Sequence, residues 1–590
     1  MDNDTRQCPE SGNRETNGSL PPVTEARDPE SAGATRRTFL RQVVGLATAS
    51  TAFGIPFGTE RSQATPEADH SVPHDEDHQR REQAFQVRKA AAQFEKDQPI
   101  PPHVSNGDEQ RYPNKIGNFS KGLPHNNLGE VNLAAYGALL HALSSGRPAD
   151  FEIIPMGDPD AALRRKLVNP QAGLAFDLEG ADSHALAIPR APAFNSAEES
   201  GEIVENYWMA LLRDVSFTEY ESSSLAHAAA SDLSSLPDFR GPRINGQVTP
   251  ACLFRGLTPG DLNGPYLSQF LWLPAPFGAG FIEQRMRCSV ASVDFLTNYS
   301  EWLNVQKGFP PQQSLQYDPV RRYIRNGRDI SQWVHIDVLY QAYFNAMMIL
   351  LRGPDASDPN SSGLGATYDS GNPYTSSQTQ GGFGTFGAPH VAALMCEVAT
   401  RALKAVWCQK WFVHRRLRPE VFAGRIHNHL TGAAHYPLFG EGLFNSPALA
   451  AVYSQNGTYL LPQAFPEGSP LHPSYGAGHA TVAGACVTIL KAWFDESFVI
   501  QNPVIPAPDG LSLLAYTGPP LAVGDELNKL AANIGFGRNI AGVHWRSDAI
   551  ESFKLGEAIA ISILRDQRLT YTENFQGFHL TKFDGTTIVI

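Results

Sequence analysis

Hydrophobic and polar residues follow two different patterns along the chain, and the change falls near Tyr317. Between about residues 98 and 300, Pro, Gly, Ser and Asn recur every few residues and separate short apolar pieces, which is typical of loops with scattered helices. After Tyr317 the apolar residues recur at intervals of three and four, as they do in helices that bury one face. We therefore expect a loop-rich N-terminal half that wraps a C-terminal bundle of helices. Helices are predicted at residues 82–96, 329–353, 388–412, 479–495, 525–535 and 547–567.

Composition divides the chain into four parts. Residues 1–64 contain a candidate export signal, and residues 65–81 are rich in His, Asp, Glu and Pro, as linkers are. The fold is expected to begin at the helical stretch that follows. We assign residues 82–310 to an N-terminal helical and loop-rich part, and residues 311–590 to a C-terminal helical-bundle part that carries the candidate site.

The export signal is centred on Arg36-Arg37 and is followed by an uncharged stretch, Val43–Ile55. This order is typical of twin-arginine export, which moves folded proteins and predicts a periplasmic or secreted location. Small residues at Ser62-Gln63-Ala64 or Ala47-Thr48-Ala49 could be the cleavage site. The structural alternative is a basic surface turn before a short core helix.

Overall composition excludes several classes of protein. The chain has 590 residues, a formal net charge of −13 at pH 7, 42% hydrophobic residues and 18% charged residues, as expected for a globular protein with one large or two ordinary domains. No apolar run reaches the roughly 18 residues that a membrane helix needs, so we expect no membrane span. The acidic balance disfavours general nucleic-acid binding. Five cysteines lie beyond residue 64 without regular spacing, and this odd number does not indicate a disulfide scaffold.

The candidate chemistry lies in three short segments of the last third of the chain: Lys410–Pro419, His472–Ala480 and Arg538–Asp548. In the first, Lys410 is the next position on the apolar stripe that passes through Val406 and Trp407. A buried ammonium is unfavourable without a partner, so an anion is expected there. Pro419 ends any preceding helix and places Arg418 at a turn. The structural alternative is that both cations lie at the surface.

In the second segment, Gly478-His479 opens a predicted helix after Pro473 and Gly476 break the chain. The free N–H groups of that helix start attract anions, and the imidazole of His479 can exchange a proton. An ordinary helix start capped by histidine is the alternative.

The third segment places Arg538 six residues before His544, and Asp548 one helical turn after it. Asp548 is therefore predicted to orient the imidazole of His544. Two guanidinium groups and one ammonium can hold three equatorial oxygens of an oxyanion, which leaves an axial position for a histidine nitrogen. A structural Arg and His near a helix start would explain this segment alone equally well.

Taken together, the three segments resemble the motifs K…RP, PSGH and R…H of the superfamily shared by vanadium-dependent haloperoxidases and class A-type acid phosphatases. The eight-residue spacing of Lys410 and Arg418, and the seven-residue spacing of His472 and His479, are most similar to the algal and bacterial bromoperoxidases. The amino-acid sequence at residues 298–308, 325–329 and 384–390 looks like that of the red-algal type. The resemblance extends over roughly residues 85–590.

The resemblance implies a mainly α-helical fold of two helical bundles, with one vanadate per subunit in the C-terminal bundle. It implies that His544 coordinates vanadium, that hydrogen peroxide and a halide are the substrates, and that the hypohalous acid formed halogenates small organic acceptors. No haem, flavin or nicotinamide is then needed. The residues implied to hold vanadate are Lys410, Arg418, Gly478, Arg538 and His544.

Further roles follow from the same resemblance. His479 would be the acid/base group and Lys410 would polarise bound hydrogen peroxide, so that both act in catalysis with His544. His472 points to bromide and iodide, whereas Trp407 is of the kind that chloride-oxidising members carry; ordinary wall packing would explain either residue equally well. Bromide is favoured.

The resemblance also suggests a homo-oligomer, with the dodecamer of red-algal relatives as the candidate assembly. A calcium ion could bind the loop 368–372, although this loop offers a single carboxylate, Asp369.

One position departs from the family pattern, because Ala477 stands where the motif has serine. The missing hydroxyl is expected to weaken vanadate binding unless water or Ser474 replaces it.

Two alternatives remain open from the sequence. The first is an acid phosphatase of the same superfamily, with His544 as the nucleophile and His479 as the acid, although phosphatases of this type are much shorter. The second is an oxyanion-binding protein without turnover, which would leave both histidines without a role.

Overall fold

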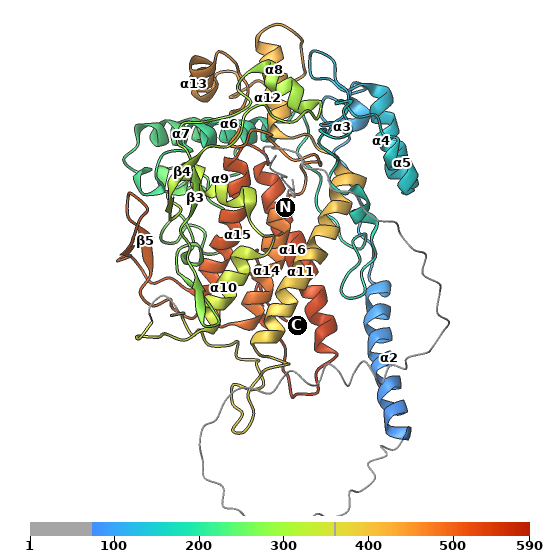
Figure 1. Ribbon diagram of the computed structural model, residues 1–590, viewed down its shortest axis with the longest axis vertical. Helices are drawn as coiled ribbons and strands as arrows, with labels where there is room; N and C mark the ends of the chain where they lie inside the picture. The colour runs from blue at the N-terminus through green and yellow to red at the C-terminus, as the bar shows by residue number, and fades with distance from the viewer. Residues whose placement is uncertain (1–73, 359–361) are drawn as a thin grey trace, which may run out of the picture. The chain divides into compact units, whose positions relative to one another are not determined.

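Long helices of the C-terminal half form the centre of the fold. In the computed structural model, which describes residues 74–358 and 362–590, α11 (Ala388–Cys408), α14 (Gly478–Trp493), α15 (Val523–Ile540) and α16 (Arg546–Arg568) pack side by side (Figure 1). All residues of α14 except His479 are buried. The mainly α-helical architecture that the sequence predicted is confirmed.

Small residues allow α14 and α16 to approach each other closely. A Cβ atom added to Gly484 would lie 2.2 Å from the backbone oxygen of Phe553, and one added to Gly556 would lie 2.0 Å from the backbone oxygen of Thr481. Since neither neighbour is a flexible side-chain end, the two glycines fix the distance between the helices that carry His479 and Asp548.

Shorter helices and loops surround this bundle. The hairpins are two-stranded and antiparallel, and they pair β1 (Ala275–Phe277) with β2 (Gly280–Ile282), β3 (Met286–Ser289) with β4 (Tyr317–Arg322), β5 (Val504–Pro506) with β6 (Leu513–Ala515), and β7 (His579–Thr581) with β8 (Thr587–Val589). The remaining α-helices are α2 (His74–Asp97), α3 (Asp108–Arg111), α4 (Leu133–Ser145), α5 (Pro148–Glu152), α6 (Ala197–Leu211), α7 (Ser224–Ser235), α8 (Tyr299–Gln306), α9 (Gly327–Ile336), α10 (Gln341–Leu351), α12 (Pro419–Leu430) and α13 (Pro447–Asn456).

Helix α6, in the N-terminal half of the chain, contributes buried glutamates beside the candidate site. Ser196 caps it by accepting a hydrogen bond from the backbone N–H of Glu199. Nearly all of its residues are buried, including the carboxylates of Glu199, Glu202 and Glu205. Because buried carboxylates need cationic partners, the glutamates of α6 are expected to form ion pairs with basic residues of the C-terminal half.

Residues 83–590 form one compact unit, in which the parts 82–310 and 311–590 share a common hydrophobic core. Helix α2 begins at His74 and therefore includes the last eight residues of the stretch predicted as a linker. The predicted twin-arginine segment and both cleavage sites lie outside the described residues. The five described cysteines are free thiols.

One predicted helix is two helices in the structure. The stretch 329–353 was expected to be continuous, but α9 ends at Ile336, α10 begins at Gln341, and the two axes are bent by 99°. Asp337 follows α9 with an extended backbone (φ −64°, ψ 151°). Its carboxylate contacts His479 on α14, and this tertiary contact replaces a continued helix.

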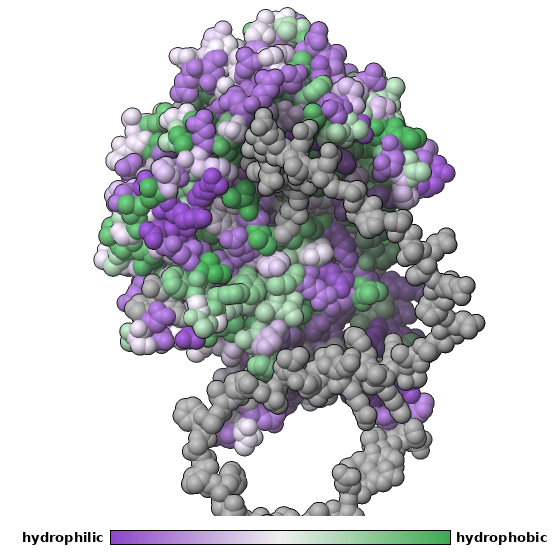
Figure 2. Space-filling view, viewed as in Figure 1, coloured by the Kyte–Doolittle hydropathy of each residue, from purple (hydrophilic) through white to green (hydrophobic). Residues whose placement is uncertain are grey.

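The viewed surface carries one apolar region, which Figure 2 shows over the lower half of the molecule, where α10 lies in Figure 1. A groove of about 310 Å³ lies there between α10, the β1–β2 hairpin and the start of α11, lined by residues such as Phe344, Met347 and Ala392. Among the described helices, no single one is long and apolar enough to cross a membrane, and α9 with α10 meets that measure only as a bent pair.

The close helix contact generates a stability prediction. Gly484→Ala is expected to destabilise the protein by about 1–3 kcal/mol, because the new methyl group meets the backbone of α16. Gly137→Ala is the matched control: Gly137 is exposed on α4 with no atom within 4 Å of the added Cβ, so it should stabilise by about 0.4–1 kcal/mol. Thermal unfolding midpoints measure both, and a Gly484→Ala midpoint equal to that of the wild type would contradict the packing argument.

Candidate active site

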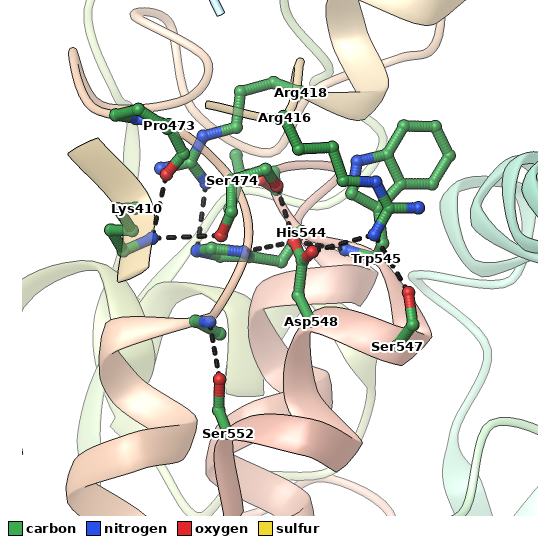
Figure 3. Close-up of polar contacts among 12 residues, drawn as sticks. Lys410, Arg416, Arg418, Pro473, Ser474, His544, Trp545, Ser547, Asp548 and Ser552 are labelled. Carbon is green, nitrogen blue, oxygen red and sulfur yellow. Dashed lines mark hydrogen bonds and ion pairs between the residues drawn. The ribbon is translucent and has the colours of Figure 1, made fainter. Parts of the chain in front are cut away.

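Lys410 is buried at the end of the central helix. α11 ends at Cys408 and continues as a π-helical turn, Gln409–His414, and this wider turn directs Lys410 into the protein. The Lys410 side chain is fully buried, and its Nζ donates hydrogen bonds to the carbonyl oxygens of Pro473 (2.8 Å) and Ser474 (2.9 Å) (Figure 3). The ammonium is thereby fixed beside the turn that precedes α14.

Arg418 joins all three segments. It is the N-cap residue of α12, and Pro419 at the first helical position sets this boundary. Its Nη1 donates to the carbonyl oxygen of Val543 (2.6 Å) and lies 2.9 Å from His544 Nε2, and its Nη2 lies 2.9 Å from His472 Nδ1. Figure 3 shows the guanidinium directed at the imidazole of His544.

His544 is held by Asp548 in one tautomer. The Nδ1 atom of His544 lies 2.8 Å from Asp548 Oδ2, and this oxygen also accepts the backbone N–H of Trp545 (3.1 Å). Burial, followed by the charges of Arg418 and Lys410, holds the pKa of His544 well below its usual value. The imidazole is therefore neutral, with its proton on Nδ1 and the Nε2 lone pair facing Arg418.

The start of α14 supplies the second histidine. Ala477 is the N-cap residue and offers no side-chain cap, and Gly478 is the first residue of the helix. A Cβ at Gly478 would lie 3.2 Å from the ring of Trp407. The Nε2 atom of His479 lies 3.0 Å from Asp337 Oδ1. Burial lowers the pKa of His479, and the carboxylate of Asp337 opposes that shift.

Arg538 approaches the same histidines from the last turn of α15. Its Nη1 donates to the carbonyl oxygen of Val334 (2.8 Å), and its guanidinium carbon lies 5.5 Å from the centre of the Phe465 ring. The Arg538 charge contributes to the lowered pKa of both His479 and His544. The structure thus brings Arg538 into the electrostatic environment of the other two segments.

The proposed halide residues lie next to each other. The rings of Trp407 and His472 are 4.9 Å apart, and Lys410 Nζ lies 5.7 Å from the Trp407 ring. The indole N–H of Trp407 donates to the carbonyl oxygen of Val168 (3.1 Å). Burial and then the charges of Lys410 and Arg418 hold the pKa of His472 well below its usual value. His472 is therefore neutral beside two cations.

The sequence analysis missed Asp337 and Arg416, and it did not predict the contact that Ser474 makes. Asp337 was assigned to the interior of a helix, and its partner His479 lies 142 residues away. Ser474 donates its hydroxyl to Asp548 Oδ2. Arg416 contacts Asp548 Oδ1 at 2.9 Å. The doublet Arg415-Arg416 was a visible signal, but no local pattern indicated its partners.

The donor set fits a small tetrahedral oxyanion. Two buried guanidinium groups, one buried ammonium and the N-terminus of α14 supply positive charge and N–H donors. His544 adds a neutral nitrogen whose lone pair is unprotonated. The close contact that a Cβ at Gly478 would make with Trp407 explains why the smallest residue begins the helix.

The predicted calcium loop gains no support. Asp369 Oδ1 accepts the backbone N–H of Gly371 (2.9 Å) and lies 3.0 Å from His579 Nδ1. Among the residues that the structure describes, no group of three or more His, Cys, Asp or Glu side chains is placed to hold a metal ion.

Comparisons with known proteins find similar sequences and a similar fold over most of the chain. A family model described as the VCPO second helical-bundle domain matches residues 394–570. The chain is 38% identical to the vanadium-dependent bromoperoxidase of Corallina officinalis, over 88% of this chain and 100% of that protein. It is 34% identical to the vanadium-dependent bromoperoxidase of Ascophyllum nodosum, over 88% and 94% of the two chains. The homohexameric structure of a second vanadate-dependent bromoperoxidase from A. nodosum matches with a TM-score of 0.81, 29% identity and coverage of 93% and 95%.

The contact between His479 and Asp337 predicts a direction of titration. Because the carboxylate raises the pKa of His479 against the effect of burial, Asp337→Asn should lower that pKa further and leave the imidazole neutral to a lower pH. A histidine-resolved NMR titration measures this. Asp369→Asn, which breaks the separate contact with His579, serves as the control and should leave His479 unchanged. An unchanged or raised His479 pKa in Asp337→Asn would refute the assignment.

Proposed function

The chain belongs to the vanadium-dependent haloperoxidase family, and we propose that it uses bound vanadate and hydrogen peroxide to oxidise bromide or iodide to hypohalous acid, which halogenates small organic acceptors. One observation carries the proposal. Lys410 and Arg418 of the first segment and His544 of the third are buried together beside the turn of the second segment that precedes α14, and the contact of Asp548 with Nδ1 leaves Nε2 of His544 unprotonated.

Each residue has a defined task in this proposal. Vanadate, when bound, supplies a Lewis-acidic centre that activates hydrogen peroxide without a change of metal oxidation state. His544 provides the nitrogen ligand, and the positive groups neutralise the oxygens of the anion. The residues proposed to hold those oxygens are Lys410, Arg418, Arg538 and the backbone N–H of Gly478.

His479 is the proposed acid/base group. Its lowered pKa favours the neutral imidazole, which can accept a proton from hydrogen peroxide as the latter binds. Asp337 at 3.0 Å stabilises the protonated form that results. The Lys410 ammonium withdraws electron density from an oxygen placed beside it, as an electrophilic group does.

Bromide and iodide are the halides we favour. The wall formed by Trp407 and His472 lies beside Lys410 and consists of an aromatic ring and a neutral imidazole. Such a surface suits a large, weakly hydrated anion better than a small, strongly hydrated one, because less hydration is lost when the larger ion binds.

We further propose that the protein acts as a homo-oligomer after twin-arginine export to the periplasm or the medium. The similar A. nodosum enzyme is homohexameric, and the dodecamer suggested by the red-algal resemblance is the alternative assembly. A calcium ion at the loop 368–372 stays a prediction.

The phosphatase alternative is weaker, because named bromoperoxidases match 88% of this chain, well beyond the helices that carry the anion site. The same geometry could nevertheless bind phosphate, with His544 as the nucleophile and His479 as the acid. The assay must therefore measure both activities on one preparation.

The proposed function predicts vanadate-dependent bromination. Protein dialysed against EDTA should brominate a phenolic dye with hydrogen peroxide and bromide only after orthovanadate is added, and His544→Ala should abolish this activity. Hydrolysis of p-nitrophenyl phosphate is measured in parallel. Phosphate-ester hydrolysis inhibited by vanadate, without bromination, would establish the phosphatase instead, and binding without either activity would leave an oxyanion-binding protein.

The second prediction concerns Ala477. Ser474 cannot replace the missing motif hydroxyl, since its own hydroxyl donates to Asp548 Oδ2, and the backbone N–H of Ala477 is bonded to Ser552 Oγ (2.8 Å). Ala477→Ser should therefore add a charge-assisted hydrogen bond and tighten vanadate binding by about 1.5–3 kcal/mol, roughly tenfold or more.

A reconstitution titration with orthovanadate measures this affinity. Ala483→Ser places the same hydroxyl deeper on α14 and is the matched control, for which the dissociation constant should not change. Equal or weaker vanadate binding by Ala477→Ser would show that the hydroxyl has no role in this site.

A further inference from the structure

Behind His544 lies a buried cluster of charges that the proposed chemistry does not use directly. Its centre is Arg416, whose Nη1 donates to Asp548 Oδ1 (2.9 Å) and Ser547 Oγ (2.9 Å). The Nη2 atom of Arg416 donates to Glu202 Oε2 (2.8 Å) and to Glu199. Arg416 and its three carboxylate partners are each at most 3% exposed. Figure 3 shows Arg416 above Asp548, on the side away from Lys410.

Neighbouring basic groups are already engaged with other carboxylates. Arg546 makes a two-point contact with Glu205 (2.5 and 2.8 Å). Arg240, more than half exposed, pairs with Asp238 and lies 3.7 Å from Glu198. The one guanidinium of Arg416 therefore faces three carboxylates. Asp108 and Glu198 add further negative charge near Glu199 and Glu202.

Burial affects the protonation of the two glutamates that contact Arg416. Burial raises the pKa of Glu202 to about 7 and that of Glu199 well above its usual value, while Arg416 opposes both shifts. A proton held on the Glu199–Glu202 pair reduces the competition for Arg416, which then remains available to Asp548. Ser547 supports this arrangement because its backbone N–H donates to Glu202 Oε1 (2.6 Å).

Asp548 connects the cluster to His544, the residue proposed to coordinate vanadium. One carboxylate oxygen contacts Arg416 and the other contacts Nδ1 of His544 (2.8 Å). The guanidinium carbon of Arg416 also lies 4.6 Å from the centre of the Trp545 ring, next to His544 in the chain. Movement of Arg416 would therefore displace the carboxylate that orients the imidazole of His544.

We propose that Arg416 is a positioning residue of the vanadate site: held by Glu199 and Glu202 of α6, it fixes the carboxylate of Asp548 in place, so that His544 retains its proton on Nδ1 and presents Nε2 to the metal. The inference rests on the proposed function, since it assigns a consequence to the tautomer of the vanadium ligand. It also gives the N-terminal half of the chain a part in the site.

The test compares Arg416→Gln and Arg416→Lys with the wild-type protein. Loss of the guanidinium should raise the dissociation constant for orthovanadate about 10–100-fold, the range typical of residues that orient metal ligands. The lysine variant should show a smaller loss, because an ammonium keeps the charge but cannot bridge the carboxylates as a guanidinium does. Arg425→Gln is the matched control: Arg425 is equally buried on α12, but donates only to the carbonyl oxygens of Leu128 and Gly129.

A second readout separates positioning from general destabilisation. Solid-state ¹⁵N NMR of vanadate-free, ¹⁵N-histidine-labelled protein reports the tautomer of His544, assigned by its loss in His544→Gln. Arg416→Gln should increase the Nε2–H form, Arg416→Lys should do so less, and Arg425→Gln should leave it unchanged.

Three results would overturn the proposal. The first is a folded Arg416→Gln protein with unchanged vanadate affinity and an unchanged His544 tautomer, and the second is an equal loss of vanadate affinity in Arg425→Gln. If Arg416→Gln does not fold, the third is an Arg416→Lys protein with the vanadate affinity and His544 tautomer of the wild type. Failure of the wild-type protein to bind vanadate would instead refute the proposed function, and the tautomer comparison would still measure the positioning by Arg416.

Discussion

Burial of positive charge around His544 is the constraint on which the rest of the site depends. Lys410 and Arg418 are completely buried, and an isolated buried cation is strongly unfavourable. The protein compensates with backbone carbonyl groups of Pro473, Ser474 and Val543. Carbonyl groups carry no net charge, so these contacts do not themselves cancel the positive charge of the two cations. The loops that supply these oxygens must therefore be held as firmly as the helices.

Close packing of the helices holds these loops in place. The glycines of α14 and α16 bring together two helices that begin at the site, one with Gly478 and the other just after His544. The turn before α14 is then fixed by its own contacts, since Lys410 binds two of its carbonyl groups and Ser474 binds Asp548. Stability and preorganisation consequently depend on the same contacts.

The sequence predicted those features that depend on local pattern. Periodicity predicted that Lys410 lies on a buried helical face, and the structure buries it in the π-helical turn that follows α11. The proline after Arg418 placed that residue at a helix boundary, as the structure has it. Asp337 escaped detection because the apolar spacing of α9 continues into α10, and only the contact with His479 breaks it. Arg416 was equally hidden, because two of its three carboxylate partners lie on α6, more than 200 residues earlier in the chain.

The replacement of the motif serine by Ala477 becomes understandable from this distribution of charge. A serine hydroxyl is an uncharged donor, so its hydrogen bond to an anion is charge-assisted by the anion alone, whereas each buried cation also brings a positive charge of its own. With two guanidinium groups, an ammonium and a helix N-terminus around the same point, loss of a single neutral donor removes a minor share of the attraction. Loss of Asp548 or of its partner Arg416 would act on the metal ligand itself. The fold accordingly uses its buried carboxylates to orient His544, and it tolerates an alanine at the helix start.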